Sequence, residues 1–116
     1  MATIAVDFDN TLANQDAEGN IWPVEGAREA MISLHQLGHV LIIHTCRTTE
    51  AIAADRLAEE VAFIEDFLHY FQIPFDQIFV GPKLIADAYV DDRAVSFRGD
   101  WPETLQQLIR YVDDVA

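Results

Sequence analysis

Short apolar runs alternate with longer amphipathic segments along this chain, and polar residues follow most of the runs directly. β-Branched and aliphatic residues predict buried strands at residues 3–6, 39–45, 77–80 and 88–90, with a short edge strand at 95–97. Residues 12–22 are polar, contain Gly19-Asn20, and are typical of a loop or a small hairpin. The intervals between the strands are long enough to hold helices.

Helical spacing fills these intervals. A first helix is expected with Pro23 near its first turn and Gly38 just past its end. A second helix runs to about Phe71, with Thr48 or Thr49 as its cap and an apolar stripe along its last two turns. At ~1.5 Å per residue this helix would exceed ~30 Å, so we expect a kink or a break near its start.

Asp100, followed three residues later by Glu103, opens a final helix with a capping-box pattern. Strands that alternate with helices predict a three-layer, Rossmann-like α/β fold, with a mostly parallel sheet and helices on both faces. The chain has 116 residues, of which 51% are apolar, so we expect a single domain over 1–116. In such sheets, ligands bind beyond the carboxyl ends of the strands.

Acidic residues dominate the charged positions and limit the partners. Seven basic residues against 20 acidic ones give a net charge of −13, which repels nucleic acid and anionic membranes. The pair Glu59-Glu60 falls in a helical segment and is interpreted as part of a solvated face. The single cysteine, Cys46, suits a reducing compartment. No signal-peptide pattern and no apolar stretch of ~20 residues is present, so we expect a cytoplasmic protein that does not bind membranes.

Four polar groups at strand ends, or in the loops directly after them, carry the candidate chemistry. They are Asp7 with Asp9 and Thr11, Thr45 with Arg47, Lys83, and Asp91 with Asp92. Any one carboxylate after a strand can be an ordinary turn or cap residue. Carboxylates that converge on one crevice, however, raise one another's pKa values unless a cation neutralises them. A hard divalent ion with oxygen ligands, usually Mg²⁺, is the economical cation.

Phosphoryl transfer is a chemistry that uses such a set of groups. A carboxylate nucleophile splits ester hydrolysis into two easier steps through an aspartyl-phosphate. A second carboxylate two residues further on can protonate the leaving oxygen and later activate water. A hydroxyl and a lysine can hold the phosphoryl oxygens while charge develops, and a metal screens the repulsion between nucleophile and phosphate.

The segment Asp7-Phe8-Asp9-Asn10-Thr11 after an apolar strand resembles the first motif of the haloacid dehalogenase superfamily of phosphatases. The second, third and fourth motifs of that superfamily are matched in order, over nearly the whole chain, by Thr45, Lys83 and Asp91-Asp92. An Asp at position 9 is typical of the phosphatases and phosphomutases of the superfamily, whereas its dehalogenases and ion-pumping ATPases lack it.

The resemblance implies a role for each matched residue. Asp7 would be the nucleophile and Asp9 the general acid and base. Thr45 and Lys83 would bind the substrate phosphate. The metal ligands would be the Asp7 carboxylate, the Asp9 backbone carbonyl and Asp91, with Asp92 as a second ligand or an orienting group.

Arg47 follows the second motif directly, and two interpretations stay open for it. It would bind the substrate phosphate or a substrate carboxylate, or it is a helix-start or surface arginine.

A cap domain has no room in the intervals between the motifs. Residues 11–45 hold only a loop and one helix, and residues 45–83 hold one helix and a strand. The resemblance therefore implies an open, capless site that accepts a bulky substrate or borrows a lid from a neighbouring subunit of a homo-oligomer. A small phosphate monoester, such as a sugar phosphate or a nucleotide, is the favoured substrate, and a phosphorylated macromolecule is the alternative. A mutase is disfavoured because it must keep its intermediate away from water.

Two functions without catalysis are alternatives to the phosphatase. A response-regulator receiver also groups acids, Thr and Lys around Mg²⁺, but it has its acidic pair after the first strand and its phosphorylated Asp after a later one. A degenerate enzyme kept as a binding module would have lost Asp7 or Asp9, and both are present.

Several residues near the motifs are expected to have structural roles. Strand alternation predicts that His44 points away from Thr45 and into the core. Cys46 is interpreted as a small buried residue. Arg93 is expected to pair with acidic neighbours.

Overall fold

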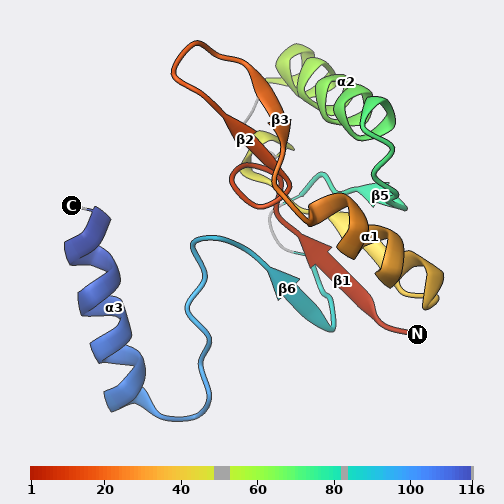
Figure 1. The fold of residues 1–116 in the computed structure, drawn as a ribbon. Helices are drawn as coiled ribbons and strands as arrows, with labels where there is room; N and C mark the ends of the chain where they lie inside the picture. The colour runs from red at the N-terminus through yellow and green to blue at the C-terminus, as the bar shows by residue number, and fades with distance from the viewer. Residues whose placement is uncertain (49–52, 82–83, 116) are drawn as a thin grey trace.

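A four-stranded parallel sheet lies at the centre of the structure, a computed structural model that describes residues 1–48, 53–81 and 84–115 (Figure 1). The elements in chain order are β1 (Thr3–Val6), β2 (Ala13–Gln15), β3 (Ile21–Pro23), α1 (Ala27–Gln36), β4 (Val40–Ile43), the 3₁₀ helix η1 (Cys46–Thr48), α2 (Ala54–Tyr70), β5 (Gln77–Ile78), β6 (Ala88–Val90) and α3 (Trp101–Val115). The central sheet has the order β5-β4-β1-β6, and all of its pairings are parallel. Strands β2 and β3 form a separate antiparallel hairpin, as the polar segment 12–22 predicts.

The register of β1, β4 and β6 brings their carboxyl ends to one edge of the sheet. Val6, the last residue of β1, pairs with Ile43 at the end of β4 and with Val90 at the end of β6. The Asp7 N–H continues this register by donating a hydrogen bond of 2.9 Å to the Val90 carbonyl. The residues that follow β1, β4 and β6 therefore leave the sheet side by side.

The main core lies on one face of the sheet. Ile4, Val6, Leu41 and Ile43 point to this face and pack with buried side chains of α1 and α2, namely Met31, Ile64, Phe67 and Leu68. The opposite face is smaller and is covered by a loop, because Ala5 and Ile42 pack with Leu84. Strand alternation thus divides β1 and β4 cleanly between two clusters.

The mostly parallel sheet without a cap is confirmed, but among the described residues helices cover only one of its faces. The crossovers from β1 to β4 and from β4 to β5 advance in the same direction across the sheet, so right-handed connections put α1 and α2 on the same side. On the other face, the described part of the return connection from β5 to β6 packs through Leu84 and contains no helix. The expected second helical layer is therefore not packed on the sheet.

Helix α3 stands away from the sheet at the end of an extended segment (Figure 1). Its side chains Trp101, Leu105 and Ile109 are 53–66% exposed, although they are spaced to form one apolar face. The predicted cap is present, because the Glu103 N–H donates a hydrogen bond of 3.1 Å to Asp100 Oδ1. The edge strand expected at 95–97 is absent, since these residues belong to the extended segment.

Two predicted helix starts are wrong. Pro23 ends β3 rather than opening α1, which begins after Gly26, a residue with a left-handed φ of 83° that glycine adopts easily. Helix α2 begins only at Ala54, and the Thr48 hydroxyl donates instead to the Phe79 carbonyl at 2.8 Å. The other proposed cap, Thr49, lies outside the described residues. No helix in the described ranges is long and apolar enough to cross a bilayer.

Because α2 packs on the sheet and α3 does not, truncating a side chain is expected to destabilise the protein more on α2 than on α3. Leu68 is fully buried in the main core, so Leu68→Ala is expected to lower the free energy of unfolding by about 3 kcal/mol. Leu105 on α3 is 55% exposed, so Leu105→Ala is expected to lower it by less than about 0.5 kcal/mol. Urea denaturation of both variants measures the difference. Equal losses would contradict the separation of α3 from the core.

Candidate active site

A cavity of about 360 Å³ lies at the carboxyl ends of β1, β4 and β6. Its lining residues are Asp7, Asp9, His44, Thr45, Cys46, Asp91, Asp92 and Arg93. Five of the seven predicted site residues therefore line one cavity, contributed by three segments that are far apart in the sequence. Arg47 is not among the lining residues, and Lys83 lies outside the described residues.

The loop after β1 turns back sharply and fixes the first two carboxylates. Asn10 has a left-handed φ of 64°, which Asn tolerates better than most residues, and its N–H donates to the Ala13 carbonyl at 2.8 Å. The Phe8 carbonyl accepts hydrogen bonds from the Leu12 and Ala13 N–H groups at 2.9 and 3.0 Å. Asp7 and Asp9 thus flank a fully buried Phe8 in a hydrogen-bonded loop.

Three carboxylates meet at the sheet edge. Asp7, Asp91 and Asp92 each offer one oxygen atom, and these atoms all lie within 4.8 Å of one another. Burial is the largest cause that raises the pKa of Asp7, to about 6, followed by a hydrogen bond to Asp92 and the negative charge of Asp91. The convergence predicted from the strand ends, with its effect on pKa, is therefore present.

The three carboxylates fit a divalent cation. Hard oxygen ligands on a half-buried and two exposed side chains are the donors that Mg²⁺ takes in proteins, and they leave positions for water and substrate. The Asp91 carboxylate is oriented by the Arg93 N–H, which donates to its Oδ1 at 2.8 Å. A cation bound here would also relieve the repulsion that raises the pKa of Asp7.

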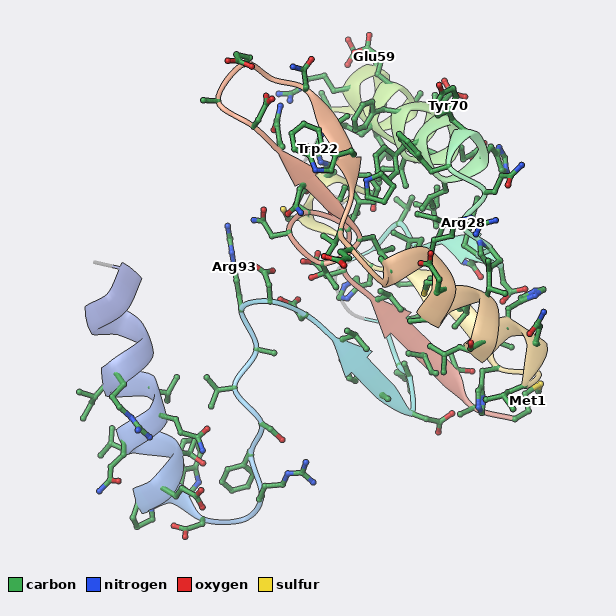
Figure 2. All side chains as sticks on the ribbon, viewed as in Figure 1. Met1, Trp22, Arg28, Glu59, Tyr70 and Arg93 are labelled. Atoms are coloured by element: carbon green, nitrogen blue, oxygen red, sulfur yellow. The ribbon has the colours of Figure 1, made fainter. Side chains whose placement is uncertain are left out.

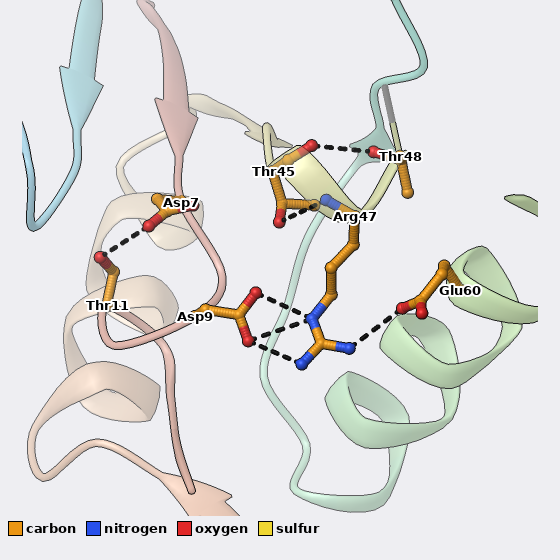
Figure 3. A network of polar contacts seen from close by, with 7 residues as sticks. All are labelled: Asp7, Asp9, Thr11, Thr45, Arg47, Thr48 and Glu60. Carbon is orange, nitrogen blue, oxygen red and sulfur yellow. Dashed lines mark hydrogen bonds and ion pairs between the residues drawn. The ribbon is translucent and has the colours of Figure 1, made fainter. Parts of the chain in front are cut away.

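Two hydroxyl groups lie close to these acids. The Thr11 hydroxyl donates a weak hydrogen bond of 3.4 Å to Asp7 Oδ2 (Figure 3). Thr45 is buried at the start of η1, and its Oγ1 accepts a hydrogen bond of 3.3 Å from the Arg47 N–H. Thr45 thus lines the cavity just before η1, in the place expected for a phosphate ligand.

Arg47 contacts the second carboxylate of the loop instead of the cavity (Figure 3). Its Nε donates to Asp9 Oδ1 and Oδ2 at 3.0 and 2.8 Å, and its Nη2 donates to Asp9 Oδ1 at 2.8 Å. Its Nη1 donates to Glu60 Oε2 of α2 at 3.0 Å. The hydrogen bond to Asp9, and then that to Glu60, hold the pKa of the guanidinium above its usual range.

Aromatic rings support the guanidinium from the core side. The Arg47 Cζ atom lies 5.2 Å from the centroid of the Phe63 ring and 5.9 Å from that of Phe8, within the range of cation–π attraction. Phe8 in turn makes an edge contact with Phe67, with ring centroids 5.2 Å apart. The site therefore rests directly on the main core.

Four residues near the site differ from the sequence-based expectations. His44 lines the cavity beside Thr45 because β4 ends at Ile43, so strand alternation no longer applies to it. Cys46 is exposed rather than buried. Arg93, which was expected to pair with acidic neighbours, lies at the turn that leaves β6 (Figure 2) and lines the cavity. Its position two residues after Asp91 was the one sign of this place in the sequence. Glu60, interpreted as solvated, is the partner of Arg47.

The raised pKa of Asp7 predicts that ionisation of this carboxyl lowers the stability of the protein when no metal is bound. Below pH 3.8 the carboxyl is protonated in both states, and its contribution to stability is fully present. That contribution is lost as the pH rises to about 6, because the unfolded state releases the proton first. In EDTA, Asp7→Asn is therefore expected to melt at a higher temperature than the wild type at pH 7, and at the same temperature near pH 4.

Thermal melting between pH 4 and pH 7 measures this difference, with Asp66→Asn as the control, since Asp66 is exposed on α2. Mg²⁺ at pH 7 is expected to raise the melting temperature of the wild type more than that of Asp7→Asn. An Asp7→Asn protein that is less stable than the wild type at pH 7 in EDTA would contradict the carboxylate repulsion.

The same fold occurs in solved structures. An MCSG target protein from Vibrio cholerae has a TM-score of 0.60 and 28% identity, over 95% of this chain and 98% of that chain. A conserved protein from Bacteroides thetaiotaomicron has a TM-score of 0.58 and 25% identity, over 94% of this chain and 90% of that chain. No family model and no curated protein matches the sequence.

A third solved structure is an enzyme, the D,D-heptose 1,7-bisphosphate phosphatase from B. bronchiseptica in complex with magnesium and phosphate. It has a TM-score of 0.51 and 19% identity, over 97% of this chain and 64% of that chain. At this identity the likeness shows the fold alone. The chain shares the α/β fold of these solved structures, and its described residues contain no cap domain.

Proposed function

We propose that this protein is a Mg²⁺-dependent phosphatase that hydrolyses a phosphate monoester through an aspartyl-phosphate on Asp7. The observation that carries the proposal is the meeting of the Asp7, Asp91 and Asp92 oxygens within 4.8 Å, in a cavity that Asp9 and Thr45 also line. The fold shared with a solved phosphatase supports the same reaction class.

The first step transfers the phosphoryl group to the protein. A carboxylate oxygen of Asp7 forms a bond to phosphorus as the bond from phosphorus to the ester oxygen breaks, and the departing oxygen takes a proton from Asp9. The hydroxyl of Thr45 donates to a phosphoryl oxygen as charge develops on it. The side chain of Lys83 is proposed to do the same.

The second step regenerates Asp7. Asp9 takes a proton from a water molecule as the water oxygen bonds to phosphorus, and the bond to Asp7 breaks to release inorganic phosphate. The Asp7 and Asp91 carboxylates, the Asp9 backbone carbonyl and Asp92 are proposed to hold Mg²⁺. Bound Mg²⁺ supplies positive charge that screens the repulsion between the nucleophile and the phosphate.

A small phosphate monoester, such as a sugar phosphate or a nucleotide, is the proposed substrate. The cavity volume of about 360 Å³ suits a small molecule, and the exposed Arg93 at its rim provides a cation for an anionic group. A phosphorylated macromolecule is the second candidate, because the described residues contain no cap over the cavity. The net charge of −13 disfavours nucleic acid and membranes as partners. We further propose that a second subunit supplies a lid and that the protein is cytoplasmic.

Phosphate release from a panel of small phosphate monoesters tests the proposed reaction. Wild-type protein with Mg²⁺ is expected to release phosphate, and EDTA is expected to stop the release. Asp7→Asn removes the nucleophile and is expected to lower turnover by about 10³-fold or more while the protein stays folded. Asp66→Asn on the exposed surface of α2 is the matched control and is expected to keep wild-type turnover. Full activity of Asp7→Asn would assign the nucleophile to another residue.

A further inference from the structure

Arg47, Asp9 and Glu60 form a chain of charges beside the cavity, and its arrangement differs from the phosphate-binding role expected for Arg47. Asp9 comes from the loop after β1, Arg47 comes from η1 after β4, and Glu60 comes from α2 (Figure 3). We propose that Arg47, anchored by Glu60, is a positioning residue that sets the direction of the Asp9 carboxylate for proton transfer to the leaving group. The proposal rests on the proposed function, in which Asp9 is the general acid.

The geometry of the contact restrains Asp9. Two nitrogen atoms of one planar guanidinium, Nε and Nη2, donate three hydrogen bonds of 2.8–3.0 Å to both oxygens of Asp9. A forked contact of this kind limits rotation of the carboxylate about its last bond, which a single point donor does not do. The forked contact still leaves a lone pair on Asp9 that can hold the proton to be transferred, because a carboxylate has about four acceptor sites.

Arg47 is itself held in place from two further directions. Glu60 accepts a hydrogen bond of 3.0 Å from Nη1, on the side of the guanidinium away from Asp9. The rings of Phe63 and Phe8 lie 5.2 and 5.9 Å from its Cζ atom. The Arg47 and Glu60 side chains are 25% and 22% exposed, so water competes only partly for these contacts. Such a guanidinium is anchored rather than free to follow a substrate.

The position of Arg47 separates this role from phosphate binding. Asp9 lines the cavity, whereas Arg47 does not. Three of its donor groups already point to two carboxylates, so a move to a phosphate would leave Asp9 and Glu60 without their cation. Proton transfer needs its donor within about 3 Å of the leaving oxygen, and an acid fixed in direction meets that condition more often than one that rotates freely.

The dependence of the rate on the leaving group tests the positioning role. An alkyl phosphate has a poor leaving group that needs a proton from Asp9, whereas p-nitrophenyl phosphate has a good leaving group that departs without one. kcat/KM is the quantity to compare, because it includes transfer to Asp7 but not the later hydrolysis that both esters share. Glycerol 3-phosphate and p-nitrophenyl phosphate are suitable probes.

Arg47→Lys keeps one positive charge but cannot form the fork. It is expected to lower kcat/KM for the alkyl ester by about 10- to 100-fold, and for the aryl ester by less than about 3-fold. Glu60→Gln keeps an acceptor for Nη1 but removes its charge, and a smaller loss of the same selective kind is expected. Glu59→Gln, one residue away on the outer surface of α2 (Figure 2), is the matched control and is expected to leave both rates unchanged.

Three results would overturn the proposal. Equal losses for both esters with a raised KM would assign Arg47 to phosphate binding, and equal losses with a lowered melting temperature would assign it to stability alone. A rate increase in Arg47→Lys would show that the contact between Arg47 and Asp9 inhibits the reaction. Failure of the proposed function looks different, because then the wild-type protein itself releases no Mg²⁺-dependent phosphate from either ester.

Discussion

Repulsion between carboxylates at one sheet edge governs the rest of this site. The register that pairs Val6 with both Ile43 and Val90 leaves Asp7 and Asp91 side by side, and Asp92 follows directly. The parallel pairing of β1 with β6 thus keeps the backbone positions of Asp7 and Asp91 close together. The protein must therefore balance the charge locally, by a proton, a cation or both. Burial first, and then the hydrogen bond to Asp92 and the charge of Asp91, raise the pKa of Asp7 to about 6.

Asp9, the fourth acid of the cavity, is balanced in a different way. Arg47 neutralises it from the side of α2, so that it does not add to the repulsion at the sheet edge. The two arrangements separate the acids into a group that suits a metal and a single residue that suits proton transfer. In a chain with 20 acidic and seven basic residues, placing one arginine between Asp9 and Glu60 is a local exception to a strongly negative surface.

The sequence was most informative where apolar runs end in polar residues. The ends of β1, β4 and β6 correctly located Asp7, Asp9, Thr45, Asp91 and Asp92, because parallel strands bring their carboxyl ends together. His44 was misplaced because its direction depends on the residue at which β4 ends. Glu60 was missed because an acid on a helix looks solvated until its partner is located in three dimensions. For α3, the apolar pattern predicts the helix but not what its apolar face packs against.

Phe8 couples the reacting groups to the bulk of the protein. It is fully buried, lies between Asp7 and Asp9 in the chain, and contacts Phe67 and Phe63 of α2 as well as Arg47. Phe8 thus links the site to the interface between the sheet and α2, which favours opening of the two together over local fraying. Amide hydrogens in the loop after β1 should then exchange with solvent no faster than those of α2.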